Sequence, residues 1–103
     1  MPAALAAVPE TAPVLVDCLT LWLTNLLLGE ADIESATRAL LAALDRAGDT
    51  VLVANETGLG IVPDNALARR FRDSAGRLNQ QIAARADHVV FVAAGLPLVL
   101  KGA

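Results

Sequence analysis

Cysteine, histidine and lysine each occur once in this sequence of 103 residues. Because Cys18 is the single cysteine, the chain has no internal disulfide and no cysteine–histidine cluster for zinc, and a reducing cytoplasm is the simplest compartment. Lys101 is the single lysine, and no G-x-x-x-x-G-K-[ST] phosphate-binding loop surrounds it. Such a loop needs its lysine for the nucleotide phosphates, so this sequence does not encode one.

Aromatic residues and positive charge are also scarce. Aromatic residues make up 3% of the chain, which predicts an aliphatic core. Eight basic residues stand against eleven acidic ones, for a formal net charge of −3. This balance gives no general attraction to nucleic acid or to anionic lipid. Residues 1–9 lack the basic segment with which a secretory signal peptide begins.

Hydrophobic residues, at 55%, are abundant enough for one folded domain over residues 1–103. Residues 15–28 are the most apolar stretch, but Asp17, Thr20 and Thr24 interrupt it. The stretch is also shorter than the roughly 20 apolar residues that a membrane span needs. We therefore expect a buried strand followed by a buried helix, with no membrane span. A membrane-associated helical protein is the alternative that the high hydropathy leaves open.

Hydrophobic periodicity predicts alternating strands and helices. Short apolar runs predict strands at residues 14–17, 51–54 and 89–93, with an edge strand at 98–100 after a turn at 95–97. Longer periodic segments predict helices at residues 19–28, 33–44 and 64–87. Asp32 can cap the second of these helices. This order of elements predicts the α/β class with a mainly parallel sheet.

Two carboxylates follow predicted strands, Asp17 after the first and Glu56 after the second. In an open parallel sheet, ligands bind outside the carboxyl ends of the strands, so both side chains are candidates for one crevice. An acidic residue at that place can hold Mg²⁺, which prefers oxygen ligands. The alternative is that each carboxylate only caps the turn or helix that follows. The neighbouring Gly58 and Gly60 indicate a simple turn, because they do not form a dinucleotide-binding fingerprint.

The remaining reactive side chains favour structural roles. His88 stands at the start of a strand, where an exposed edge position is favoured over a general base. Cys18 and Trp22 read as buried hydrophobic residues rather than as a nucleophile and a stacking platform. Arg69 and Arg72 belong to the solvated face of a helix, although either could reach a phosphate.

Several ordered motifs resemble one enzyme family. They are residues 17–27 (DCLTLWLTNLL), 55–65 (NETGLGIVPDN), 69–80 (RRFRDSAGRLNQ) and 95–97 (GLP). The chain resembles the bifunctional adenosylcobinamide kinase/adenosylcobinamide-phosphate guanylyltransferases of cobalamin biosynthesis. The likeness covers nearly everything from residue 14 to residue 101.

The resemblance implies a P-loop protein with a RecA-like sheet that assembles as a homo-oligomer, a trimer. It implies phosphorylation of adenosylcobinamide by a nucleoside triphosphate, ATP or GTP with Mg²⁺, and then transfer of GMP from GTP through a guanylylated histidine. Asp17 matches the family's acidic residue that contacts the guanine nucleotide. Asn55 and Glu56 match a motif at the same sheet edge, which makes Asp17 and Glu56 the nucleotide-binding candidates. For Arg69, Arg72 and Asn79 the motif match gives no assigned role.

This chain departs from the family at its most reactive parts. The family's P-loop and guanylylated histidine precede the matched motifs, and His88 falls outside the motif that carries that histidine. We therefore expect an incomplete RecA-like sheet that lacks the N-terminal P-loop strand, no catalytic residue in this chain, and no activity of the chain alone. The alternative is a non-catalytic remnant that serves as an oligomerisation or interaction module.

Overall fold

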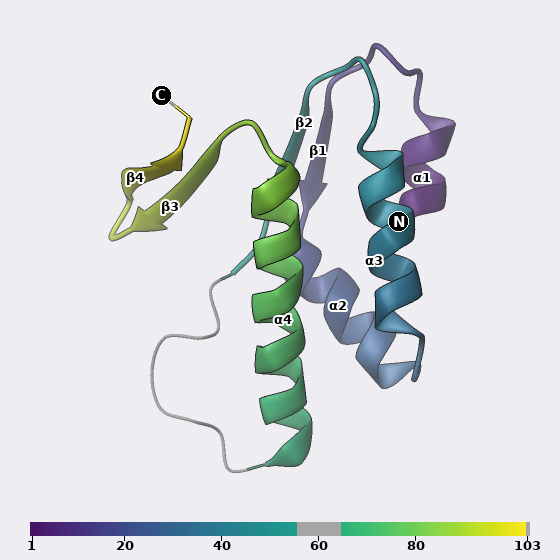
Figure 1. Cartoon of the computed structure of the whole chain (residues 1–103), viewed down its shortest axis with the longest axis vertical. Helices are drawn as coiled ribbons and strands as arrows, with labels where there is room; N and C mark the ends of the chain where they lie inside the picture. The colour runs from purple at the N-terminus through teal and green to yellow at the C-terminus, as the bar shows by residue number, and fades with distance from the viewer. Residues whose placement is uncertain (56–64, 103) are drawn as a thin grey trace.

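The computed structural model describes residues 1–55 and 65–102, in which helices and strands alternate (Figure 1). In chain order the elements are α1 (Pro2–Ala7), β1 (Val14–Asp17), α2 (Leu19–Leu28), α3 (Ile33–Ala43), β2 (Thr50–Val53), α4 (Ala66–Arg85), β3 (Val89–Ala93) and β4 (Leu96–Lys101). The α/β class is therefore confirmed. The strands β1 and β3 and the helix α2 have the predicted bounds, and the other bounds differ by a few residues.

Local capping explains where the two amphipathic helices begin. The Asp32 carboxylate accepts a hydrogen bond from the Ser35 backbone N–H at 3.2 Å, which confirms the predicted cap of α3. The Asn65 side chain accepts from the Ala68 backbone N–H at 2.7 Å, so α4 begins at Ala66. Each bond satisfies one of the backbone donors that the first turn of a helix leaves unpaired.

The predicted single sheet is not what the described residues form. Strands β1 and β2 pair in parallel, with Leu15 opposite Val51 and Asp17 opposite Val53, as expected. Strand β3 was expected to extend this parallel sheet, but in the described part of the chain it pairs with β4 alone and antiparallel. The two sheets are separate, as Figure 1 shows.

A tight turn explains the local pairing of β3. Ala94 and Gly95 both have positive φ angles, 52° and 75°, as the two central residues of a type I′ hairpin turn require. The turn therefore lies one residue earlier than predicted, and β4 begins at Leu96 rather than at Leu98. Pro97 is tolerated opposite Val92 because β4 is an edge strand.

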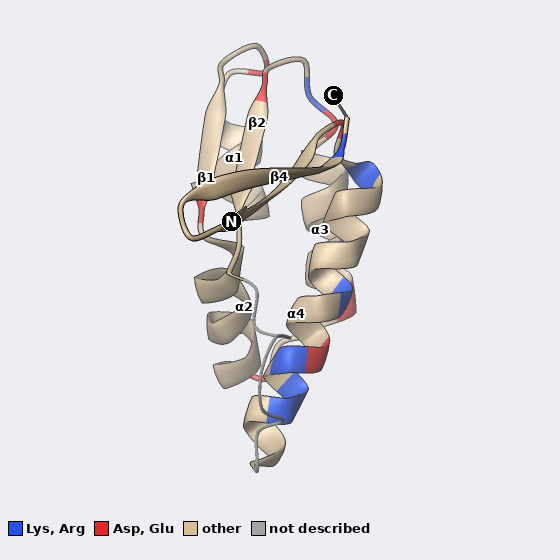
Figure 2. Ribbon diagram, turned by 90° about the vertical axis from the view of Figure 1, so that its left-hand side faces the viewer, with Lys and Arg blue, Asp and Glu red and all other residues tan. Residues whose placement is uncertain are grey.

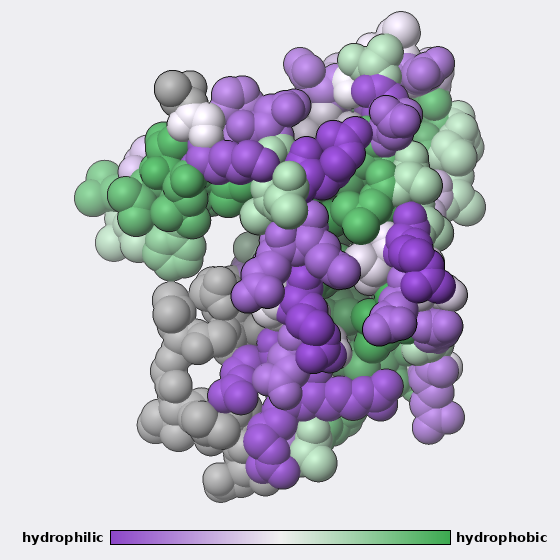
Figure 3. All heavy atoms as spheres, in the orientation of Figure 1, coloured by the Kyte–Doolittle hydropathy of each residue, from purple (hydrophilic) through white to green (hydrophobic). Residues whose placement is uncertain are grey.

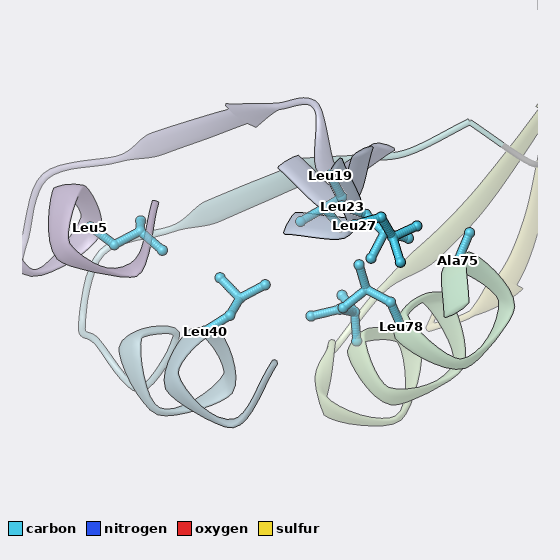
Figure 4. Close-up of a cluster of buried hydrophobic side chains, with 8 residues drawn as sticks. Leu5, Leu19, Leu23, Leu27, Leu40, Ala75 and Leu78 are labelled. Atoms are coloured by element: carbon cyan, nitrogen blue, oxygen red, sulfur yellow. The ribbon is translucent and has the colours of Figure 1, made fainter. Parts of the chain in front are cut away.

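The core is aliphatic, as predicted, and centres on α2 (Figure 4). Leu19, Leu23 and Leu27 repeat every four residues along α2 and are all buried. Leu23 and Leu40 of α3 are fully buried, at 0% exposure. The other buried hydrophobic residues are Leu5 of α1 and Ala75, Leu78 and Ile82 of α4. Because every helix contributes, this cluster joins all four helices to the inner face of the β1–β2 sheet.

The β1–β2 sheet leaves one apolar face exposed, and the β3–β4 hairpin exposes apolar side chains on both faces. On β1 and β2 the side chains of Val14, Val16 and Leu52 pack against the core, whereas Leu15 and Val51 are 65% and 57% exposed. The hairpin carries a larger exposed group: Val90, Val92, Leu96, Leu98, Val99 and Leu100. Figure 3 shows this group as a hydrophobic patch over β3 and β4. Patches of this kind are typical of surfaces that another segment or partner covers.

Arg46 joins the loop before β1 to the start of β2 through hydrogen bonds. Its guanidinium donates to the carbonyl oxygens of Pro9 at 2.8 Å and Ala12 at 2.7 Å, and to the Thr50 hydroxyl at 3.3 Å. Gly48 lies in the same contact, because a Cβ there would collide with the Ala12 carbonyl oxygen. The α3 helix already ends at Ala43.

The apolar stretch at residues 15–28 is divided between a strand and a ten-residue helix. Among the described residues, no helix combines the length and the apolarity needed to cross a bilayer.

We predict that Arg46→Met lowers the free energy of unfolding by about 1.5–3 kcal/mol, because bonds from a charged donor to the exposed Pro9 carbonyl and the partly buried Ala12 carbonyl are lost. Arg85→Met is the matched control, since Arg85 makes a surface ion pair with Asp45 at 3.8 Å and such pairs contribute little. Urea denaturation of both variants measures the difference. Equal stability of the two variants would contradict the structural role of Arg46.

Candidate functional site

The carboxyl ends of β1 and β2 lie side by side and form the candidate site. Because the strands are parallel and in register, Asp17 ends β1 directly opposite the last residue of β2, Val53. The peptide bond between Asp17 and Cys18 is cis. Helix α2 begins immediately afterwards, at Leu19, and runs away from this edge (Figure 1).

A hydroxyl in the first turn of α2 fixes the chain after β2. The Asn55 backbone N–H donates to the Thr20 hydroxyl oxygen at 2.8 Å. Within α2, the backbone carbonyl of Thr20 accepts a hydrogen bond from the Thr24 hydroxyl at 2.9 Å. The bond between Asn55 and Thr20 holds Asn55 next to the first turn of α2. Asn55 and Asp17 therefore lie at the same edge of the sheet.

Asp17 has an exposed side chain and does not cap α2. The N-cap of α2 is Cys18, which makes no side-chain capping bond. Within residues 1–55 and 65–102, the Asp17 carboxylate has no hydrogen bond or ion pair. Asp17 therefore does not cap the helix that follows it, which was one form of the structural alternative.

A small hollow adjoins Asp17 but does not make a complete ligand site. It has a volume of about 260 Å³ and lies between α1 and β1, lined by residues such as Leu5, Val16 and Asp17. Sites for small molecules usually enclose about 300–1,000 Å³. The hollow is below that range, so it does not form a complete small-molecule site by itself.

The second predicted carboxylate, Glu56, lies outside the described residues, as do Gly58 and Gly60. The described residues contain no group of three or more side chains that could hold a metal ion by themselves. Asp17 nevertheless fits Mg²⁺ chemically, because this ion is often bound through one or two carboxylates together with substrate phosphates.

The other sequence candidates lie elsewhere. His88 is exposed before β3 and adjoins Gly102 rather than Asp17. Trp22 is half-buried against the core, which confirms the prediction that it is a core residue rather than a stacking platform. Arg72 forms an ion pair with Asp73 at 3.4 Å on α4. Cys18 is half-buried at the start of α2, less enclosed than predicted.

Comparison with known proteins decides the family. The family model described as cobinamide kinase/cobinamide phosphate guanyltransferase matches residues 1–100. The chain belongs to this family.

Curated relatives agree with the family match. The bifunctional adenosylcobalamin biosynthesis protein CobP of Pseudomonas aeruginosa is 54% identical over 91 residues, covering 85% of this chain and 53% of the relative. The proteins of the same description named CobU are 43% identical in Salmonella typhimurium, covering 90% of this chain and 60% of the relative, and 42% identical in Escherichia coli, covering 85% and 58%. The chain thus spans between half and three fifths of the length of these relatives.

Thr20 is the site residue that sequence reasoning missed in this member of the cobinamide kinase family. In the sequence, Thr20 is evident only as a polar residue that interrupts the apolar stretch at residues 15–28. The available signal was its position: a hydroxyl in the first turn after an acidic strand end can reach a second strand that ends at the same edge.

We predict that Thr20→Val frees the segment after β2, because valine keeps the shape of threonine and removes the acceptor for the Asn55 N–H. Hydrogen exchange at the Asn55 amide should accelerate, and the free energy of unfolding should fall by about 0.5–1.5 kcal/mol. Thr24→Val is the control, since its hydroxyl bonds only within α2. Unchanged exchange at Asn55 in Thr20→Val would show that the bond does not hold this edge.

Proposed function

We propose that this chain forms the carboxyl-edge half of the nucleotide site of an adenosylcobinamide kinase/adenosylcobinamide-phosphate guanylyltransferase. In this proposal it works in cytoplasmic cobalamin biosynthesis on adenosylcobinamide, with ATP and GTP as nucleotides. The observation that supports it best is the Asp17 carboxylate at the end of a parallel strand, which has no partner among the described residues, in a chain that matches the family model.

Asp17 contributes negative charge at the place where a parallel sheet receives its ligand. Its carboxylate would hold Mg²⁺ or accept a hydrogen bond from the nucleotide, and Glu56 is proposed as a second contact from its motif match. Bound Mg²⁺ would neutralise charge on the phosphates. The Thr20–Asn55 bond holds the described chain after β2 at the same edge of the sheet as Asp17.

Both transfer steps need groups that this sequence does not contain. Phosphoryl transfer needs a cradle of backbone N–H groups with a cation at the phosphates, and the G-x-x-x-x-G-K-[ST] pattern is absent. Guanylyl transfer in the family uses a histidine outside the motifs matched here. We therefore propose that the chain is inactive alone and that a strand bearing a P-loop completes a RecA-like sheet. In the described part of the chain both sheets are two-stranded, so their strands have unpaired edges that could receive that strand.

The uncovered face of β1 and β2 supports a second function. Leu15 and Val51 are exposed side by side, as in a surface that contacts another subunit. A non-catalytic chain could use this face to join a homo-oligomer, such as a trimer of the complete enzyme. The two functions differ in one respect, because only the first needs the Asp17 charge.

The test is Asp17→Asn in a protein completed by fusing the N-terminal segment of a relative. GTP affinity, both transfer rates and the melting curve are measured. We expect nucleotide-dependent activity to fall by about 100-fold or more, because a charged hydrogen-bond partner contributes about 1.5–3 kcal/mol and a displaced Mg²⁺ adds to the loss. Thermal stability should change little, since Asp17 is exposed.

Asp49→Asn is the matched control, because Asp49 is exposed at the opposite end of the β1–β2 sheet. Unchanged GTP affinity and rates in Asp17→Asn would contradict the nucleotide-binding role. A completed protein that assembles normally but has no activity even with Asp17 intact would favour the interaction module.

A further inference from the structure

A second, larger groove lies between α3 and α4, away from the carboxyl edge of the sheet. Its volume is about 580 Å³, within the usual range for small-molecule sites, and Asp17 is not among its lining residues. Apolar side chains of Ile33, Leu41 and Leu78 also line it. In Figure 3 hydrophilic side chains of α3 and α4 border a hydrophobic strip between the two helices.

Three arginines converge on this groove, although the chain as a whole is acidic. Arg70 and Arg77 come from α4 and Arg38 from α3, and all three are exposed. Arg70 and Arg77 are two helical turns apart, so they lie on the same side of α4, about 10 Å apart along its axis. Figure 2 shows that most of the positive charge follows α4.

The charge on the α4 side of the groove is not balanced by acidic partners. On α3, Arg38 shares its surroundings with Asp32 and Glu34, which line the same groove. The Asp32 carboxylate is engaged as the cap of α3. By contrast, Arg70 and Arg77 have no ion pair in the described part of the chain, where the acidic residue of α4, Asp73, pairs with Arg72.

Two hydroxyls on largely buried residues add uncharged donors. Thr37 on α3 and Ser74 on α4 are each 4% exposed and line the groove. Within residues 1–55 and 65–102, neither hydroxyl is hydrogen-bonded to another residue, and neither hydroxyl oxygen is fully enclosed. Ser74 stands between Arg70 and Arg77 along α4, so one oxygen-rich ligand could meet a guanidinium on each side and a hydroxyl in the middle.

We propose that the groove between α3 and α4 binds a phosphate-bearing ligand of nucleotide size, held by Arg70 and Arg77 with the hydroxyls of Thr37 and Ser74. Arginine suits this ligand because its planar guanidinium makes paired hydrogen bonds to phosphate oxygens. The apolar floor gives room for an uncharged part of the ligand beside its phosphates. This site is separate from the carboxyl edge and does not depend on the function proposed for Asp17.

The test uses the chain itself with tripolyphosphate and ATP as probes in titration calorimetry at low salt. We expect Arg70→Gln and Arg77→Gln each to weaken binding of both probes about tenfold or more, as expected for a lost charged hydrogen bond. Arg77→Lys should bind with intermediate affinity, because lysine keeps the positive charge but lacks the paired N–H donors of the guanidinium. Arg85→Gln is the matched control on the same helix outside the groove and should change affinity less than twofold.

Three results would overturn the proposal. They are no binding by the unaltered chain, equal losses in all three glutamine variants, and equally tight binding of a short polyglutamate, which would assign the groove to an acidic peptide. ATP binding more tightly than tripolyphosphate would indicate that the floor holds a nucleoside. If a variant fails to fold by circular dichroism, phenylglyoxal modification of the unaltered chain decides, with tripolyphosphate expected to protect Arg70 and Arg77 before Arg85.

Discussion

The packing of the leucine ridge on α2 is the constraint on which the rest of this structure depends. Leu19, Leu23 and Leu27 point from one helix toward α3, α4 and the inner side of the first sheet (Figure 4). Burial of each such side chain contributes about 1.5–3 kcal/mol. The ridge also has a functional consequence, because α2 starts directly after β1. Its position fixes the end of β1, and hence Asp17, together with the Thr20 hydroxyl that holds Asn55.

The same ridge makes the fold one-sided. Helices cover the inner face of β1 and β2, whereas the outer face and most of the β3–β4 hairpin remain apolar and exposed. The hairpin is anchored to α4 by the Lys101 ammonium, which donates to the carbonyl oxygens of Ala83 and Ala84 at 3.0 and 3.1 Å. This cation lies at the C-terminal end of a helix, where the helix dipole favours it. These exposed apolar surfaces agree with the proposal that the described part of the chain is completed by a further segment.

Local signals in the sequence were sufficient for most of the elements. The apolar runs located β1 and β3, and Asp32 located the start of α3. Strand partners were less predictable, because the pairing of β3 depends on whether a neighbour lies at its other edge and on a turn at Ala94 that propensity does not favour. At the site, Asp17 was predictable from its position after a buried strand. The Arg46 and Thr20 bonds join segments 34 to 37 residues apart, and no local pattern encodes them.

The dependence of the fold on the α2 ridge can be tested with two substitutions on one helix. Leu23 is 0% exposed and Leu21 is 60% exposed, so Leu23→Ala and Leu21→Ala remove the same atoms from a buried and an exposed position. Denaturant unfolding should show a loss of about 3–5 kcal/mol for Leu23→Ala, or loss of cooperative folding altogether. For Leu21→Ala the change should stay within about 0.5 kcal/mol. Equal effects of the two substitutions would contradict the account, because α2 would then not be the helix around which the core is packed.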